Sequence, residues 1–137
     1  MDAGKQFRTV VAADGDPGPA ILEALEFAKD FVKTCSLQQH LSRKLMVVVE
    51  ELVANVLRHG ATEGGVQLQL WLSSVPGGVA LEIHDDGTAF DPTLDFRFRG
   101  PDATTGGGTG LEIARSWVSN FQYCRIDSQN RLTGHLS

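Results

Sequence analysis

The chain has 137 residues and a formal net charge of −5, with 42% hydrophobic and 21% charged residues. This length predicts a single domain over residues 1–137, and the composition excludes disordered, collagen-like and coiled-coil proteins. The absence of a dense Lys/Arg run, of a secretory signal and of any apolar run longer than Leu45 to Val49 excludes direct nucleic-acid and membrane partners, so we expect a cytoplasmic protein.

The N-terminal part of the chain predicts one strand followed by two helices. Residues 6–13 are rich in β-branched side chains and predict a short strand, and a cluster of Asp, Gly and Pro separates it from a helix that ends near Thr34. Ser36 is expected to cap a second, longer helix over residues 37–59, and Gly60 is expected to terminate it.

Two strands with regular alternation follow these helices. Residues 66–73 carry Val or Leu at every second position, and residues 79–84 alternate again after a turn that contains Pro and Gly, which predicts an antiparallel hairpin. Residues 86–105 show neither the helical nor the strand period. A stretch of this length inside a compact domain indicates either an error in assigning the elements or a functional lid.

The C-terminal part predicts a helix and a last hairpin. The helix covers residues 109–119 and is entered through glycines, and the strands of the hairpin cover residues 120–127 and 131–136. This order of elements predicts an α+β fold, a two-layer α/β sandwich in which helices cover one face of a mainly antiparallel or mixed sheet.

The second helix carries a carboxylate and an amide on one face. At 100° per residue, Asn55 lies about 40° from Glu51, whereas the apolar residues of this helix lie on the other side. Glu51 and Asn55 therefore project where a ligand could reach them. Considered alone, this spacing is also typical of a solvated helix face.

The second strand of the first hairpin ends in the pattern D-x-G-x-x-F-D, from Asp85 to Asp91. A carboxylate at a strand end can accept a hydrogen bond from an exocyclic amine such as that of adenine. Gly87, which has no Cβ, would let the backbone approach a flat ring. The alternative is that Asp-Asp-Gly forms an ordinary turn.

Glycines gather at the entrance of the last helix. The run from Thr104 to Leu111 reads TTGGGTGL, and eleven of the fifteen glycines lie between Gly60 and Gly110. Free N–H groups and the partial positive charge of a helix N-terminus make this run a candidate phosphate site. It fits neither the Walker A nor the Rossmann pattern, and a flexible linker is the alternative.

Taken together and in this order, the three motifs resemble the N, G1 and G2 boxes of the GHKL superfamily, which shares the Bergerat ATP-binding fold of gyrases, histidine kinases and MutL. The chain is most similar to the bacterial anti-sigma-factor serine/threonine kinases. Residues 49–60 resemble their E-x-x-x-N-x-x-x-H-G helix, and residues 85–92 resemble their D-x-G-x-x-F-D-P segment. The likeness covers nearly the whole chain.

This resemblance implies a site for ATP and Mg²⁺. Asn55 would ligate Mg²⁺, Glu51 would act as the general base, and Asp85 and Gly87 would hold the adenine. The segment 86–105 would be the ATP lid. The phosphates would be lined by the helix-entrance residues Gly106, Gly108, Thr109 and Gly110.

The resemblance also implies partners. Such a kinase transfers the γ-phosphoryl group of ATP to a Ser or Thr of an antagonist with the STAS fold, holds a sigma factor inactive, and forms a homodimer. Two alternatives remain: a nucleotide-gated module that sequesters a partner without kinase turnover, and a switch kinase that activates a PP2C-type phosphatase. The last strand lacks the Gly-Thr dipeptide expected beside the adenine, which leaves Thr133 as a candidate substitute.

Overall fold

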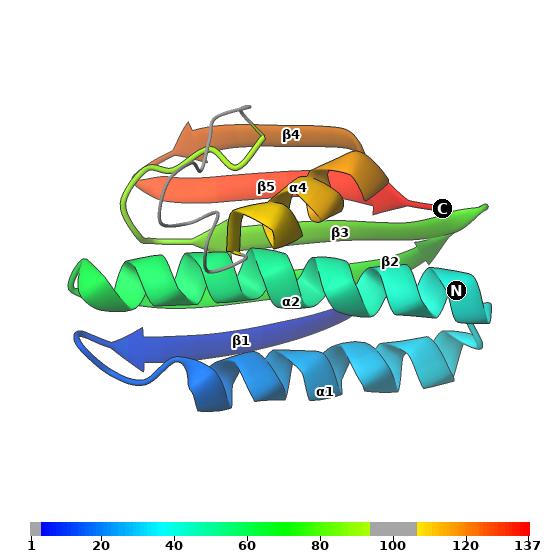
Figure 1. Cartoon of the computed structure of the whole chain (residues 1–137), viewed down its shortest axis with the longest axis horizontal. Coiled ribbons are helices and arrows are strands. Elements are labelled where there is room, and N and C mark those ends of the chain that lie inside the picture. Colours follow the sequence, from blue (N-terminus) through cyan, green and yellow to red (C-terminus); the bar gives the residue numbers. More distant parts are fainter. Residues whose placement is uncertain (1–3, 94–106) are drawn as a thin grey trace.

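The computed structural model describes residues 4–93 and 107–137, and its elements lie in the predicted order (Figure 1). The strands are β1 (Lys5–Ala12), β2 (Gly65–Val75), β3 (Gly78–Asp85), β4 (Ser119–Ile126) and β5 (Gln129–Leu136). The helices are α1 (Gly18–Cys35), α2 (Gln39–Thr62) and α4 (Gly107–Trp117). In the described ranges, no helix has the length and apolar character needed to cross a membrane.

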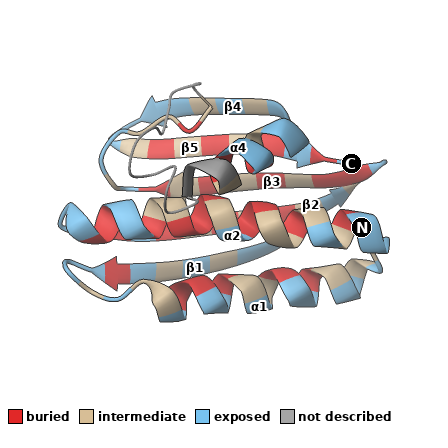
Figure 2. Ribbon diagram, in the orientation of Figure 1, coloured by how far each residue is buried: buried red, intermediate tan, exposed pale blue. Residues whose placement is uncertain are grey.

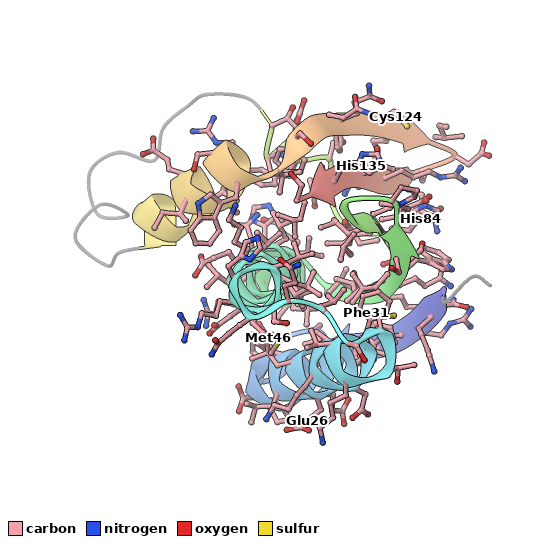
Figure 3. All side chains as sticks on the ribbon, turned by 90° about the vertical axis from the view of Figure 1, so that its right-hand side faces the viewer. Glu26, Phe31, Met46, His84, Cys124 and His135 are labelled. Carbon is pink, nitrogen blue, oxygen red and sulfur yellow. The ribbon has the colours of Figure 1, made fainter. Side chains whose placement is uncertain are left out.

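The five strands form one sheet in the order β1-β2-β3-β5-β4, and every neighbouring pair is antiparallel. The three helices lie side by side on one face of this sheet, and Figure 3, which looks along α1 and α2, shows the two layers. The predicted α+β fold, with helices on one face of an antiparallel sheet, is therefore confirmed.

The core lies between the helices and the covered face of the sheet (Figure 2). In β2, Leu68, Leu70 and Leu72 are fully buried, whereas Gln67 is exposed on the other face. This alternation is the period-2 pattern on which the strand was predicted. The buried side of α2 likewise follows its predicted apolar stripe, with Leu45, Leu52 and Leu57 among its most buried side chains.

The ends of α2 differ from the prediction. Ser36 is not the N-cap of α2: it follows α1 in the left-handed conformation, with φ of 52° and ψ of 48°, and its N–H caps α1 by donating to carbonyl groups of the last turn. Gly60 does not end α2 either, because the helix continues to Thr62. Gly60 is buried, and a Cβ there would overlap the side chain of Val66 on β2. This glycine is required by the close packing of helix on sheet and not by a helix terminus.

The last hairpin is present, and β5 begins two residues earlier than predicted. Asp127 and Ser128 form its turn with φ values of 53° and 64°, the left-handed conformation that short hairpin turns require. This turn places Asn130 inside β5 and directly opposite Asp85 of β3. The register therefore brings a second polar side chain to the strand end where the sequence indicated only Asp85.

Candidate functional site

A pocket lies between the C-terminal half of α2 and the ends of β3, β4 and β5. It is lined by polar groups of Asn55 and His59 from α2, by Asp85 and Gly87 at the end of β3, and by Tyr123 and Asn130 from the last hairpin. Its remaining walls are mostly apolar and include Val56, Ile83, Phe90 and Leu132. An apolar pocket with a few convergent polar groups is typical of a site for a small organic molecule.

Asp85 is the buried carboxylate of this pocket, with 7% of its surface exposed. Its Oδ1 accepts hydrogen bonds from the N–H of Gly87 and from Nδ2 of Asn130, each at 2.9 Å. Burial raises the pKa of Asp85 above its ordinary value, and the hydrogen bonds from Asn130 and Gly87 oppose that rise because they stabilise the charged form. Among the described residues Oδ2 has no hydrogen-bond partner, so it is available to accept one from a ligand.

Asn130 and two side chains that bind it were missed by the sequence reasoning. Tyr123 Oη and Arg125 Nη1 donate to the Oδ1 of Asn130, at 2.6 Å and 2.9 Å. Asn130 is 5% exposed and lies on the face of β5 that also carries Leu132 and Leu136. Asn130 stands at a position of the strand pattern where an apolar residue is expected. Because buried polar groups need hydrogen-bond partners, an Asn at such a position indicates a polar contact inside the protein.

Thr133, the candidate substitute at the adenine side, does not reach the pocket. It alternates with the buried positions of β5 and lies against Glu82 and Gln122 on the open face of the sheet. The residue that contacts Asp85 from β5 is Asn130, three positions earlier.

Glu51 lies where α2 meets the N-terminal turn of α4. The two helices pack against each other at Gly110, where a Cβ would overlap the Glu51 carboxylate. The carboxylate is partly buried. This burial raises the pKa of Glu51; neighbouring Glu50 raises it further, and Arg58 lowers it. Glu51 therefore lies beside a helix N-terminus, the position predicted to receive phosphates.

Asn55 follows Glu51 by one helical turn and lines the pocket. Its amide makes no hydrogen bond with the described part of the chain. Mg²⁺ in nucleotide sites is held by one or two protein oxygens together with phosphate oxygens and water, so a single free amide oxygen fits the ion. Within residues 4–93 and 107–137, no group of three or more His, Cys, Asp or Glu side chains could hold a metal by itself.

The structure thus brings Asn55, Asp85 and Gly87 into one pocket and Glu51 against Gly110. Gly108 and Thr109 belong to the first turn of α4. Gly106 and residues 94–105 of the predicted lid lie outside the described residues. The sequence did not indicate the ring contact between His59 and Phe90, whose centroids are 5.6 Å apart on the wall of the same pocket.

Comparison with known proteins agrees with this arrangement. The family model described as histidine kinase-like ATPase domain matches residues 15–133, a range that contains every residue of the pocket. The serine/threonine-protein kinase BtrW of Bordetella bronchiseptica is 32% identical over 93 residues. That alignment covers 65% of this chain and 66% of BtrW, slightly less than two thirds of either protein. A domain of this family binds ATP. The chain belongs to the family of histidine kinase-like ATPase domains.

Proposed function

We propose that the protein is an ATP-dependent serine/threonine kinase of the anti-sigma type. It phosphorylates a Ser or Thr of a STAS-fold antagonist, binds a sigma factor, and acts as a homodimer. The similarity to a protein named as a serine/threonine kinase supports the reaction. The motif resemblance described above supports the choice of partners.

The observation that carries the proposal is the position of the Glu51 carboxylate against Gly110, at the first turn of α4. Phosphates bound at this helix N-terminus would lie next to the Glu51 carboxylate, which accepts no hydrogen bond from any described residue. A base in this position is within reach of a hydroxyl that approaches the terminal phosphate. A module that only bound nucleotide would have no need of a carboxylate there, because its charge repels the phosphates.

In the proposed reaction, the oxygen of the substrate hydroxyl forms a bond to the γ-phosphorus. The bond from that phosphorus to the β–γ bridging oxygen breaks, and ADP leaves. Glu51 accepts the proton of the hydroxyl. Backbone N–H groups at the start of α4 hold the phosphates, and Asp85 holds the base at the other end of the pocket. Bound through Asn55, Mg²⁺ would neutralise phosphate charge.

The direct test is phosphate transfer to a STAS-domain protein. The purified chain is incubated with ATP, Mg²⁺ and a STAS-fold antagonist encoded beside it or in the same genome, and phosphoserine and phosphothreonine are located by mass spectrometry. We expect transfer to one hydroxyl, and capture of a sigma factor by the chain when the antagonist is phosphorylated. Recovery of a PP2C-type phosphatase and no sigma factor would favour the switch kinase, and ATP binding without transfer would favour the sequestering module.

The charges beside Glu51 predict opposite shifts of the pH profile. Glu50 raises the pKa of Glu51 and Arg58 lowers it, and the base works only when it is deprotonated. We expect Glu50→Gln to move the acidic limb of kcat to lower pH and Arg58→Gln to move it to higher pH. Measuring kcat between pH 5 and pH 8 at saturating ATP checks this, and shifts of the same sign in both variants would contradict the assignment of Glu51 as the base.

The contact between Glu51 and Gly110 predicts that one methyl group added at position 110 lowers the rate of phosphate transfer. In Gly110→Ala the new Cβ overlaps the carboxylate of Glu51, so the base or the first turn of α4 must move. Because misplacement by about 1 Å can cost about 100-fold in rate, we expect kcat to fall by about that factor. Ser116→Ala, on the exposed side of the same helix, is the matched control and should leave kcat unchanged. An active Gly110→Ala would show that this contact is absent during transfer.

A further inference from the structure

A chain of hydrogen bonds runs behind the Asp85 carboxylate, from the edge of the sheet inwards. Arg125 and Tyr123, both on the edge strand β4, donate to the Oδ1 of Asn130, and the Nδ2 of Asn130 donates to the Oδ1 of Asp85. Arg125 is exposed, Tyr123 is partly buried, and Asn130 and Asp85 are buried. The chain therefore connects a surface residue to the carboxylate of the pocket.

The two donors from β4 determine which way the Asn130 amide faces. With the Oδ1 of Asn130 held by two donors, its NH₂ group must point towards Asp85. The reversed amide would direct its oxygen at a carboxylate oxygen and its NH₂ at two donors, which is unfavourable on both sides. In this orientation Nδ2 also donates to the carbonyl oxygen of Thr88, with 2.9 Å between the nitrogen and the oxygen.

The same side chains hold the backbone that follows β3. Arg125 Nη1 donates to the carbonyl oxygen of Gly87 at 3.0 Å, and Asn130 donates to that of Thr88. Gly87 in turn donates its N–H to Asp85. As a result, the carboxylate and the glycine beside it are fixed by one connected set of bonds.

We propose that Asn130, Tyr123 and Arg125 are positioning residues that select a 6-amino purine over a 6-oxo purine. The proposal rests on ATP as the nucleotide of the proposed kinase. The Oδ1 of Asp85 is saturated by two donors, so Oδ2 is the acceptor left for the base. The 6-amino group of adenine donates to that oxygen, whereas the 6-oxo group of hypoxanthine places a second acceptor against it. The bonds to Oδ1 fix the orientation of the carboxylate and so turn Oδ2 to the base, which makes the three residues position the acceptor on which this discrimination depends.

Binding of ATP and of ITP, measured by calorimetry with the full chain, tests the proposal. The variants are Tyr123→Phe, Arg125→Met and Asn130→Ala, and the matched control is Cys124→Ser, an exposed side chain between the two β4 residues. We expect each variant to weaken ATP binding by about tenfold, the usual effect of losing a hydrogen bond to a charged or buried polar group. ITP binding and the control should change by less than about twofold. A merely structural role would lower both affinities together.

A double-mutant cycle shows whether Arg125 acts through Asn130. In an Asn130→Ala background, we expect Arg125→Met to change the ATP-to-ITP ratio less than it does in the unmodified protein, because only its bond to the carbonyl oxygen of Gly87 remains to be lost. Equal losses for ATP and ITP, the same effect of Arg125→Met in both backgrounds, or a wild type that binds the two nucleotides equally would each overturn the proposal. If Asn130→Ala does not fold, the ratios for Tyr123→Phe and Arg125→Met decide it. A wild type that prefers ATP but transfers no phosphate would contradict the proposed kinase and leave this inference standing.

Discussion

Glu51→Gln is expected to abolish phosphate transfer and to spare ATP binding. Glutamine has nearly the same volume as glutamate, so it fits against Gly110, but it cannot accept the proton of the attacking hydroxyl. Loss of a general base typically costs about 100-fold to 10,000-fold in rate. The affinity for ATP should be unchanged or slightly higher, because the neutral amide does not repel the phosphates. Initial rates of transfer and calorimetry on the same samples check both parts.

The adjacent residue supplies the control for this experiment. Glu50 has the same side chain on the same helix and is exposed. Glu50→Gln removes one negative charge but no base, so it should keep the rate of the unmodified protein on the alkaline side of the acidic limb. A transfer rate unchanged in Glu51→Gln would show that another group accepts the proton.

Asp85→Asn is expected to remove most of the ATP affinity without unfolding the protein. The carbonyl oxygen of the new amide would take the place of Oδ1, because two donors face that position. Its NH₂ group would then replace Oδ2 and point a donor at the amine of adenine. Loss of a charged acceptor and the opposition of two donors should lower the affinity by at least about 30-fold. Calorimetric titration with ATP measures this loss.

In Asp85→Asn, the affinity for ATP is expected to fall without a matching fall in the free energy of unfolding. Burial raises the pKa of Asp85, which means that the environment disfavours its charge, so a neutral side chain relieves that cost. The free energy of unfolding, measured in denaturant, should therefore not fall in proportion to the loss of binding. Asp86→Asn is the control: Asp86 is exposed and its Oδ1 accepts the N–H of Gln67 at 2.7 Å, outside the pocket. ATP binding that survives Asp85→Asn would exclude Asp85 as the acceptor for the base.

The sequence predicts the layers and the two main parts of the site for a clear physical reason. Alternation in β2 and the apolar stripe of α2 depend only on which face of each element is buried, so they are visible without any knowledge of contacts. Glu51 and Asn55 share a face because helix geometry fixes the angle between them. The pocket then gathers Asn55 and Asp85, residues far apart in the sequence that the motif resemblance had joined.

What the sequence did not predict depends on contacts between distant segments. Ser36 and Gly60 are residue types that commonly cap helices. The reason for a glycine at position 60 is instead the side chain of Val66, which the turn after α2 brings against it and which leaves no room for a Cβ. Asn130 joins the site because the turn at Asp127 and Ser128 sets the register of β5 opposite Asp85. A shift of one residue in that turn would have turned Asn130 to the other face of the sheet.

Val66 supports both walls of the pocket although it does not line it. A Cβ at Gly60 would overlap its side chain, and a Cβ at Gly87 would lie 3.5 Å from its Cγ2. One valine thus acts as a spacer between α2, which carries Asn55 and His59, and the segment after β3, which includes Gly87. A larger or smaller side chain at position 66 would widen or narrow the pocket without changing any residue that lines it. The size of ligand that the pocket accepts can therefore be changed by a substitution in the hydrophobic core.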